Sequence, residues 1–172
     1  MIKAVKRLTP EQKNDIWELV KAADREFIPT LSSREDTTQK NLTSQTGKRE
    51  PTSYYNALLS QSFILCIENG RVAGFISYIP DYHLINDKGL DTVCDYVSTV
   101  IVSPDSRRKG YTTKMYKKLF SSGKGKTVMT RTWSQNKAHI ALLEKIGFKL
   151  VLTIENDRGK GIDTVYYLRG EQ

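Results

Sequence analysis

Apolar residues recur along this chain with two different periods, and each period predicts a different kind of element. Runs rich in β-branched and aromatic residues predict strands at 2–8, 63–68, 72–78, 92–102, 127–133, 149–155 and 164–168. Apolar positions spaced three and four residues apart predict helices at 10–23, 111–120 and 137–146. We expect a single α/β domain over residues 1–172, in which one mixed sheet carries helices on both faces.

Turn-forming residues mark where several of these elements begin or end. Asn69-Gly70 joins two strand-like runs, and because both residues tolerate positive φ it predicts a tight hairpin. Gly147 suits the left-handed position that closes a helix. The long stretch 32–53 is polar, so we expect a loop there with at most short helical turns.

The composition is that of an ordinary globular protein. Apolar residues make up 38% of the chain and charged residues 27%, which argues against a fibrous or extensively disordered class. The charged first residues do not form a signal peptide. The longest uncharged stretch, 54–67, is shorter than the roughly 18 apolar residues of a membrane span. We therefore expect a cytoplasmic protein that does not enter a membrane.

The two cysteines do not suggest a metal centre. Cys66 and Cys94 lie inside strand-like runs, and neither has a second cysteine or a histidine at metal-binding spacing. Buried reduced thiols are the interpretation that fits this pattern. We expect no metal site in this chain.

Most of the net charge of +8 comes from one segment. Between residues 104 and 126 Asp105 is the only acid, and the basic residues there are Arg107, Arg108, Lys109, Lys114, Lys117, Lys118, Lys124 and Lys126. Such a local field attracts an anionic ligand. A lysine-rich helix face in contact with water gives the same count, so the charge alone leaves both interpretations open.

A glycine-containing loop in this segment leads directly from a strand into a helix. In that arrangement the unpaired backbone N–H groups and the positive end of the helix dipole converge on one point, which forms an anion site. We expect the anion to be a pyrophosphate. Each dipole contact contributes only about 0.3–1 kcal/mol, so Arg107, Arg108 and Lys109 are expected to add direct charge.

The same loop carries a motif. The spacing Arg107-x-x-Gly110-x-Thr112, with Val102-x-Pro104 before it, resembles the pyrophosphate signature of the GNAT acetyltransferases, Gln/Arg-x-x-Gly-x-Gly/Ala. Thr112 stands where that pattern has a small residue, which puts the affinity for the phosphate in doubt rather than the fold. Alone, a motif of this length would be a weak signal.

A second motif follows at the expected distance. Asn136 precedes a helical stretch that ends in Gly147-Phe148, which resembles the second signature of the superfamily. Two signatures in this order, separated by a predicted strand, make the resemblance specific. It implies a mostly antiparallel, splayed sheet, and acetyl-coenzyme A held by the strand, basic loop and helix between residues 91 and 120.

The resemblance also implies roles for individual residues. The backbone of Val100 and Val102 would pair with the pantetheine arm as an added strand does. Asn136 would contact the cofactor from the other side of the splayed sheet, although capping its helix would account for asparagine there without a ligand. The amides that would hold the pyrophosphate belong to Arg107, Arg108, Lys109, Gly110, Tyr111 and Thr112.

Two residues are candidates for proton transfer. Tyr96 stands where histone-acetylating relatives carry a glutamate base, and His139 shares an inward-facing helical stripe with Leu142 and Ile146. A packing tyrosine and a satisfied, half-buried histidine are the alternatives for these two positions. Leu143 occupies the place where many members carry a tyrosine general acid, so the usual proton donor is missing.

The resemblance thus implies an N-acetyltransferase that moves an acetyl group from acetyl-coenzyme A to a primary amine by direct attack, as a monomer or homodimer. The acceptor stays open among a small molecule, a peptide and a protein, since its pocket is expected to be shaped by the variable segments 27–56, 81–88 and 156–163.

Rival functions are a basic nucleic-acid-binding module and a catalytically silent acyl-coenzyme A sensor. The aromatic residues are not interleaved with the basic charge as stacking platforms, since Tyr116 and Phe120 share the apolar face of the predicted helix opposite its lysines. This disfavours the first, whereas the missing tyrosine acid keeps the second open.

Overall fold

The computed structural model describes residues 1–43, 49–123 and 125–170. Within these ranges seven strands form one open sheet in the order β1-β2-β3-β4-β5-β7-β6. Strands β4 and β5 run parallel, and the other neighbouring strands run antiparallel. The strands are β1 (Ile2–Val5), β2 (Ser62–Glu68), β3 (Arg71–Ile85), β4 (Asp91–Val102), β5 (Val128–Trp133), β6 (Lys149–Ile154) and β7 (Thr164–Arg169). The predicted mixed, mostly antiparallel sheet is confirmed.

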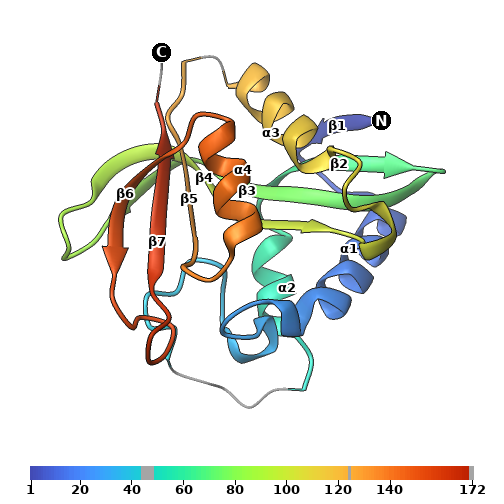
Figure 1. Ribbon diagram of the computed structural model, residues 1–172. Helices are drawn as coiled ribbons and strands as arrows, with labels where there is room; N and C mark the ends of the chain where they lie inside the picture. Colours follow the sequence, from blue (N-terminus) through green and yellow to red (C-terminus); the bar gives the residue numbers. More distant parts are fainter. Residues whose placement is uncertain (44–48, 124, 171–172) are drawn as a thin grey trace.

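Helices cover both faces of this sheet, as predicted (Figure 1). One face packs against α1 and α2 through Phe63 and Leu65 of β2, and the other packs against α3 and α4 through Ile64 and Cys66. Neighbouring residues of β2 serve opposite faces because side chains alternate along a strand. The helices are α1 (Pro10–Ala23), α2 (Thr52–Leu58), α3 (Tyr111–Ser122) and α4 (Lys137–Lys145), with 3₁₀ turns at Asp24–Glu26, Leu31–Ser33 and Pro104–Ser106.

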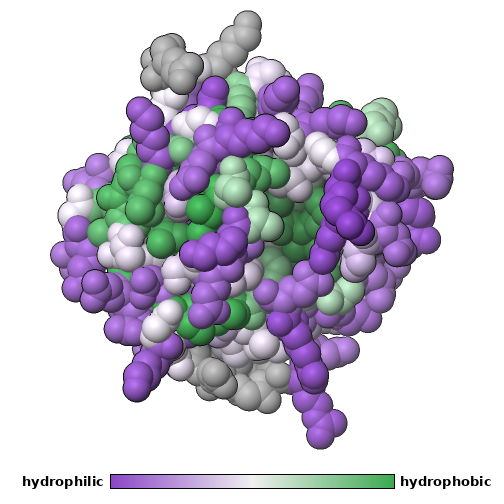
Figure 2. Space-filling model, viewed as in Figure 1, coloured by the Kyte–Doolittle hydropathy of each residue, from purple (hydrophilic) through white to green (hydrophobic). Residues whose placement is uncertain are grey.

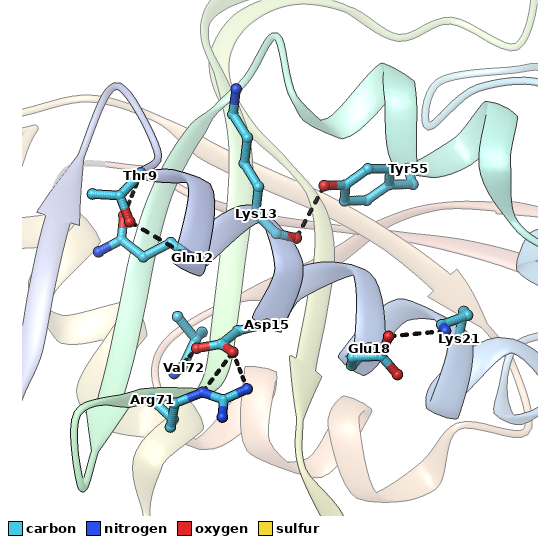
Figure 3. Close-up of polar contacts among 9 residues, drawn as sticks. All are labelled: Thr9, Gln12, Lys13, Asp15, Glu18, Lys21, Tyr55, Arg71 and Val72. Atoms are coloured by element: carbon cyan, nitrogen blue, oxygen red, sulfur yellow. Dashed lines mark hydrogen bonds and ion pairs between the residues drawn. The ribbon is translucent and has the colours of Figure 1, made fainter.

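Helix α1 is fixed at its start and at its middle (Figure 3). Thr9 and Gln12 form a capping box, in which each side chain accepts a hydrogen bond from the backbone of the other. One turn further on, the carboxylate of Asp15 accepts hydrogen bonds from Arg71 Nε at 2.7 Å and from the backbone N–H of Val72 at 2.9 Å. The helix is thereby held against the start of β3.

Helix α2 is an element that the sequence did not predict, since its first residues belong to the polar stretch 32–53. It is only seven residues long, which is too short to be stable on its own. Tyr54 and Leu58, one turn apart, are fully buried, and the hydroxyl of Tyr55 donates to the carbonyl of Lys13 in α1 at 3.0 Å. Tertiary contacts therefore form this helix. Among the described helices, none is long and apolar enough to cross a membrane.

Strands β4 and β5 separate after a short parallel pairing. Their ladder joins Asp95–Val97 to Val128–Thr130 and goes no further. At this point β4 carries a β-bulge, because Tyr78 of β3 lies opposite Val97 whereas Ser77 lies opposite Thr99, which leaves Ser98 as the extra residue. A bulge bends and twists its strand. The second half of β4 consequently diverges from β5, and the splayed sheet implied by the resemblance is present.

Hydrogen bonds fix the bulge from the α2 side of the sheet. The hydroxyl of Ser98 donates to Gln61 Oε1 at 2.6 Å, and the amide of Gln61 donates to Thr37 Oγ1 at 2.7 Å. The hydroxyls of Tyr54 and Thr99 lie 2.6 Å apart and are both buried. Because buried polar groups are costly to leave unpaired, this network holds the bulge in one conformation.

Candidate active site

A cavity of about 370 Å³ lies between the diverging ends of β4 and β5. This volume falls within the roughly 300–1,000 Å³ of sites that take small molecules. Figure 2 shows an apolar hollow beside α4, bordered by hydrophilic surface. The residues lining the cavity from the sheet and α4 include Val100, Val102, Thr130, Thr132, Asn136, His139 and Leu142, and those from other segments include Glu26, Phe27, Arg34, Arg107, Thr112 and Arg158.

The loop before α3 has the backbone of an anion site. Arg108 and Gly110 both adopt positive φ, 60° and 73°. Helix α3 starts at Tyr111, and its first backbone hydrogen bond runs from Lys114 to Gly110. The amides before Lys114 in the first turn have no carbonyl partner among the described residues. A Cβ built on Gly110 would meet no atom within 4 Å, so space for an anion lies directly above the loop.

Glu68, at the end of β2, braces this loop from below. Its carboxylate accepts hydrogen bonds from the hydroxyl of Ser106 at 2.7 Å, from Lys109 Nζ at 3.0 Å and from the hydroxyl of Tyr111 at 3.0 Å. These three donors, with Ser106 first, lower the pKa of Glu68 to about 2. No local pattern in the sequence points to this role, because Glu68 lies about 40 residues before its partners.

The basic segment is partly neutralised by acids from elsewhere in the chain. The guanidinium of Arg107 binds both carboxylate oxygens of Glu26, at 2.9 and 2.7 Å, and donates from Nε to the carbonyl of Val102 at 3.0 Å. Lys109 pairs with Glu68, and Lys126 binds Asp81 and Asp95. Arg108 makes no ion pair with a described residue, and Lys124 lies outside the described residues. The expected cluster of unpaired charge is therefore smaller than the sequence suggests.

Asn136 lies on the wall of the cavity. Its side chain makes no capping hydrogen bond to α4. Instead the amide nitrogen donates to the hydroxyl of Thr132 in β5 at 3.0 Å. The alternative in which this asparagine only caps its helix is wrong. The carbonyl oxygen of the side chain keeps its capacity to accept a hydrogen bond from a ligand.

Tyr96 does not line this cavity. The residue is 2% exposed, and its ring packs against that of Tyr82 with 5.3 Å between the centroids. Burial raises the pKa of the Tyr96 phenol. The phenol therefore stays protonated at neutral pH, in an environment that matches the packing alternative.

His139 does line the cavity, and it is half-buried. Its Nε2 lies 3.1 Å from the hydroxyl of Tyr116, and the two rings stack. Burial lowers the pKa of His139 to about 4. Leu143, at the place of the family's tyrosine acid, is fully enclosed in the cluster around Tyr116 and does not reach the cavity. A neutral imidazole is thus the titratable group that α4 contributes.

This lowered pKa predicts a pH-dependent stability. Between pH 4 and 6.5 the unfolded chain binds a proton at His139 that the folded chain does not, so the free energy of unfolding falls as the pH falls through this window. The full pKa difference corresponds to about 3 kcal/mol, and partial exposure reduces our expectation to roughly 2 kcal/mol. Urea unfolding of the parent and of His139→Gln at pH 7 and 4.5 isolates this histidine, because other groups are common to both. If the free energy of unfolding changed equally with pH in the two proteins, His139 would not be buried in its neutral form.

Two of the three segments that we expected to shape the acceptor pocket line this cavity. Segment 27–56 supplies Phe27, Arg34 and Thr37, and segment 156–163 supplies Arg158. No residue of 81–88 lines it. In that segment β3 continues to Ile85 and pairs with β4 from Asp91. No cluster of three or more His, Cys, Asp or Glu side chains suited to a metal ion occurs within the described ranges.

Comparisons with known proteins agree with this geometry. The acetyltransferase (GNAT) family model matches residues 19–148, and no curated protein matches the chain. An aminoglycoside 6′-N-acetyltransferase complexed with coenzyme A is 14% identical, with a TM-score of 0.68 over 99% of this chain and 96% of that one. An aminoglycoside 6′-N-acetyltransferase from Enterococcus faecium is 15% identical, with a TM-score of 0.65 over the same shares of the chains. An acetyltransferase of the GNAT family from Bacillus cereus is 17% identical, with a TM-score of 0.63 over 100% and 99%.

Proposed function

Because this chain belongs to the acetyltransferase (GNAT) family, we propose that it transfers an acetyl group from acetyl-coenzyme A to a primary amine by direct attack in a ternary complex. The observation that carries this proposal is the cavity between β4 and β5, which reaches Arg107 and Thr112 at the two ends of the glycine loop before α3. A thioester arm and an amine can meet there without a covalent enzyme intermediate.

The residues around the cavity fit acetyl-coenzyme A. The first-turn amides of α3 and the space above Gly110 suit a pyrophosphate. The open edge of β4 at Val100 and Val102 suits the amides of a pantetheine arm, since β5 no longer pairs with it. The carbonyl of Val102 accepts one hydrogen bond from Arg107 Nε and keeps its second lone pair for the pantetheine arm. Asn136 offers its carbonyl oxygen from the opposite wall.

Proton removal is the larger of the two proton-transfer problems. For a lysine-like amine with a pKa of about 10.4, forming the free base at pH 7 costs roughly 4.6 kcal/mol, whereas expelling an unprotonated thiolate with a pKa of about 8.5 costs only about 2 kcal/mol relative to the thiol. A water can supply the proton to the thiolate, so Leu143 is tolerated. Of the two predicted residues, His139 is the better proton acceptor because it lines the cavity and is neutral at pH 7.

A survey of amines tests this function. Purified protein with acetyl-coenzyme A is offered a broad panel of small amines, peptides and lysine-containing proteins, and release of the coenzyme A thiol is measured. We expect turnover with at least one amine, and Tyr96→Phe should leave kcat/KM within a factor of about three because the phenol lies outside the cavity. Tight acetyl-coenzyme A binding with no turnover on any acceptor would favour the silent sensor. Salt-resistant, sequence-selective RNA binding without turnover would favour the nucleic-acid module.

A further inference from the structure

Three arginines from distant parts of the chain meet on the acceptor side of the cavity. Arg34 comes from the segment between α1 and α2, Arg131 from β5 and Arg158 from the loop between β6 and β7, and all three line the cavity. Arg34 is 5% exposed and Arg158 is 6% exposed, whereas Arg131 is half-buried. Arginine is rarely this buried unless it has a partner of opposite charge.

Backbone and hydroxyl groups hold two of these side chains. Arg34 donates from Nε and Nη2 to the carbonyl of Pro29, at 3.1 and 2.8 Å. Arg158 donates from Nε to Thr164 Oγ1 at 3.0 Å and from Nη1 to the carbonyl of Ile28 at 2.7 Å. These bonds use two nitrogens of each guanidinium. The third nitrogen, Nη1 of Arg34 and Nη2 of Arg158, has no hydrogen bond to any described residue.

Arg131 also has one guanidinium nitrogen without a hydrogen bond to a described residue. Its Nη2 donates to the carbonyl of Gln39 at 2.6 Å, and its Nη1 lies 3.5 Å from the hydroxyl of Tyr166. Nε has no partner within the described part of the chain. Among described residues, Asn86 Nδ2 is the one fully enclosed side-chain nitrogen or oxygen without a hydrogen bond. The spare donors of the three arginines are therefore not enclosed, and the cavity they line gives them access to a ligand.

Aromatic rings keep the guanidinium planes in place. The guanidinium carbon of Arg34 lies 5.7 Å from the ring centroid of Phe27 and 5.8 Å from that of Tyr54. That of Arg158 lies 5.9 Å from the ring of Trp133, which itself packs on Phe27 at 5.5 Å. Cation–π contacts of this kind orient the charge without neutralising it. The spare donors are thus preorganised.

No described carboxylate forms an ion pair with these three arginines, although Asp24 and Asp157 act against the lowering of the pKa of Arg34 and Arg158. Glu26 is the one acid that lines the cavity, and it is already bound by Arg107. Asp24 accepts hydrogen bonds from Ser32, and Asp157 accepts one from Thr164, so neither forms an ion pair with the cluster. Burial, together with the like charges of Arg34 and Arg131, lowers the pKa of Arg158 to about 9. The guanidinium therefore stays charged at pH 7.

We propose that the acceptor is a small amine that also bears a carboxylate or phosphate group, and that this anion binds the spare donors of Arg34, Arg131 and Arg158. The proposal rests on the acetyltransferase function above and names the class of its acceptor. A planar guanidinium fork matches a carboxylate or phosphate geometrically as well as electrostatically. The cavity is small and is shared with the pantetheine arm, so the acceptor is of amino-acid size rather than a protein surface.

The same charges help with the reaction. Positive charge beside an amine disfavours its ammonium form and lowers its pKa. In a free amino acid the neighbouring carboxylate stabilises the ammonium form of the amine, and pairing that carboxylate with the arginines removes this stabilisation. The arginines thereby increase the fraction of free amine near pH 7, in a cavity whose other titratable groups among the described residues are His139 and the paired Glu26. Amines that carry several positive charges are repelled.

Matched pairs of acceptors test the proposal. Thiol release with acetyl-coenzyme A is measured for each of the common L-amino acids beside its α-carboxamide, and for O-phosphoethanolamine beside ethanolamine. We expect the anionic member of the best pair to have a kcat/KM at least about 100-fold higher, because a neutral analogue leaves the guanidinium donors unpaired. The two sets of pairs distinguish a carboxylate from a phosphate. Equal rates within every productive pair would overturn the proposal.

Arginine variants locate the anion. In Arg34→Gln, Arg131→Gln and Arg158→Gln, the preference for the anionic member should fall at least tenfold, and the corresponding lysine variants should retain part of it. The control is Arg71→Gln, which removes the charge of an exposed arginine that pairs with the buried Asp15 away from the cavity, and it should keep the full preference. Stabilisation by acetyl-coenzyme A shows which variants are folded. Arg34 and Arg158 also bind backbone carbonyls, and their variants lose these structural hydrogen bonds too. The preference of the parent protein for the anionic acceptor is measured without any variant, so it tests the proposal by itself.

Two further measurements separate the possible failures. If no amine is acetylated, the proposed function fails. The anion site is then tested separately, by comparing the melting temperature of the protein with N-acetyl-amino acids and with the corresponding amides. A higher melting temperature with the acids alone supports the site, and equal melting temperatures overturn it. If succinyl-coenzyme A reacts faster than acetyl-coenzyme A while acids and amides react equally, the arginines bind the acyl group instead, and the proposed acceptor class is wrong.

Discussion

Gly110→Glu removes acetyl-coenzyme A binding while leaving the protein folded. The parent protein should gain about 2.7 kcal/mol of stability at 100 times the dissociation constant of the ligand. At Gly110 a glutamate would place its side chain and its negative charge in the space above the loop, where a Cβ meets no protein atom and where the first-turn amides of α3 are unpaired. We expect the affinity to fall at least about 100-fold, measured by titration calorimetry and by the shift in melting temperature.

The control for this variant is Gly89→Glu. Gly89 also has positive φ, 97°, and a Cβ there also meets no atom within 4 Å, but it lies in the turn between β3 and β4. Both variants force a non-glycine residue into a left-handed conformation, and both should lose about 1 kcal/mol of stability without ligand. Only Gly110→Glu should lose the ligand-induced shift. An equal shift in the two variants would place the pyrophosphate elsewhere.

Glu68→Ala weakens cofactor binding although Glu68 does not line the cavity. The substitution leaves Ser106, Lys109 and Tyr111 without their shared acceptor, so the loop loses the contact that fixes it before the ligand arrives. We expect the dissociation constant of coenzyme A to rise about tenfold, because charged hydrogen bonds of this kind are among the stronger ones. Glu68→Gln keeps one acceptor oxygen but no charge, so its dissociation constant should lie between those of the parent and Glu68→Ala. Titration calorimetry of the three proteins gives the series.

A surface acid provides the comparison for Glu68. Among the described residues Glu18 pairs only with Lys21, on the exposed face of α1, so Glu18→Ala should leave coenzyme A binding unchanged. The depressed pKa of Glu68 adds a pH test. Above its ordinary pKa of 4.5 the Glu68 carboxylate is fully ionised and its stabilising effect on the loop is complete. This effect is lost as the pH falls toward about 2. If Glu68→Ala bound coenzyme A as tightly as the parent, the backbone of the loop would be sufficient by itself.

Local pattern was sufficient for much of the fold and for the glycine loop before α3. The hairpin at Asn69-Gly70, the helix after Gly110 and the helix end at Gly147 all depend on neighbouring residues, and the structure contains each of them. Helix α2 could not be recognised because Tyr54 and Leu58 become helical only when they pack against α1. The continuation of β3 to Ile85 likewise depends on its pairing with β4.

The sequence by itself determined that this chain is a mixed α/β protein in which a strand, a glycine loop and a helix follow one another, since periodicity and turn chemistry act over a few residues. Only the tertiary structure decided how its charges are shared. It pairs Arg107 with Glu26 and Lys109 with Glu68, and it leaves Arg34, Arg131 and Arg158 facing a cavity. The reason is physical: the interaction of two charges depends on their distance and burial, and residues far apart in sequence acquire both only when the chain folds.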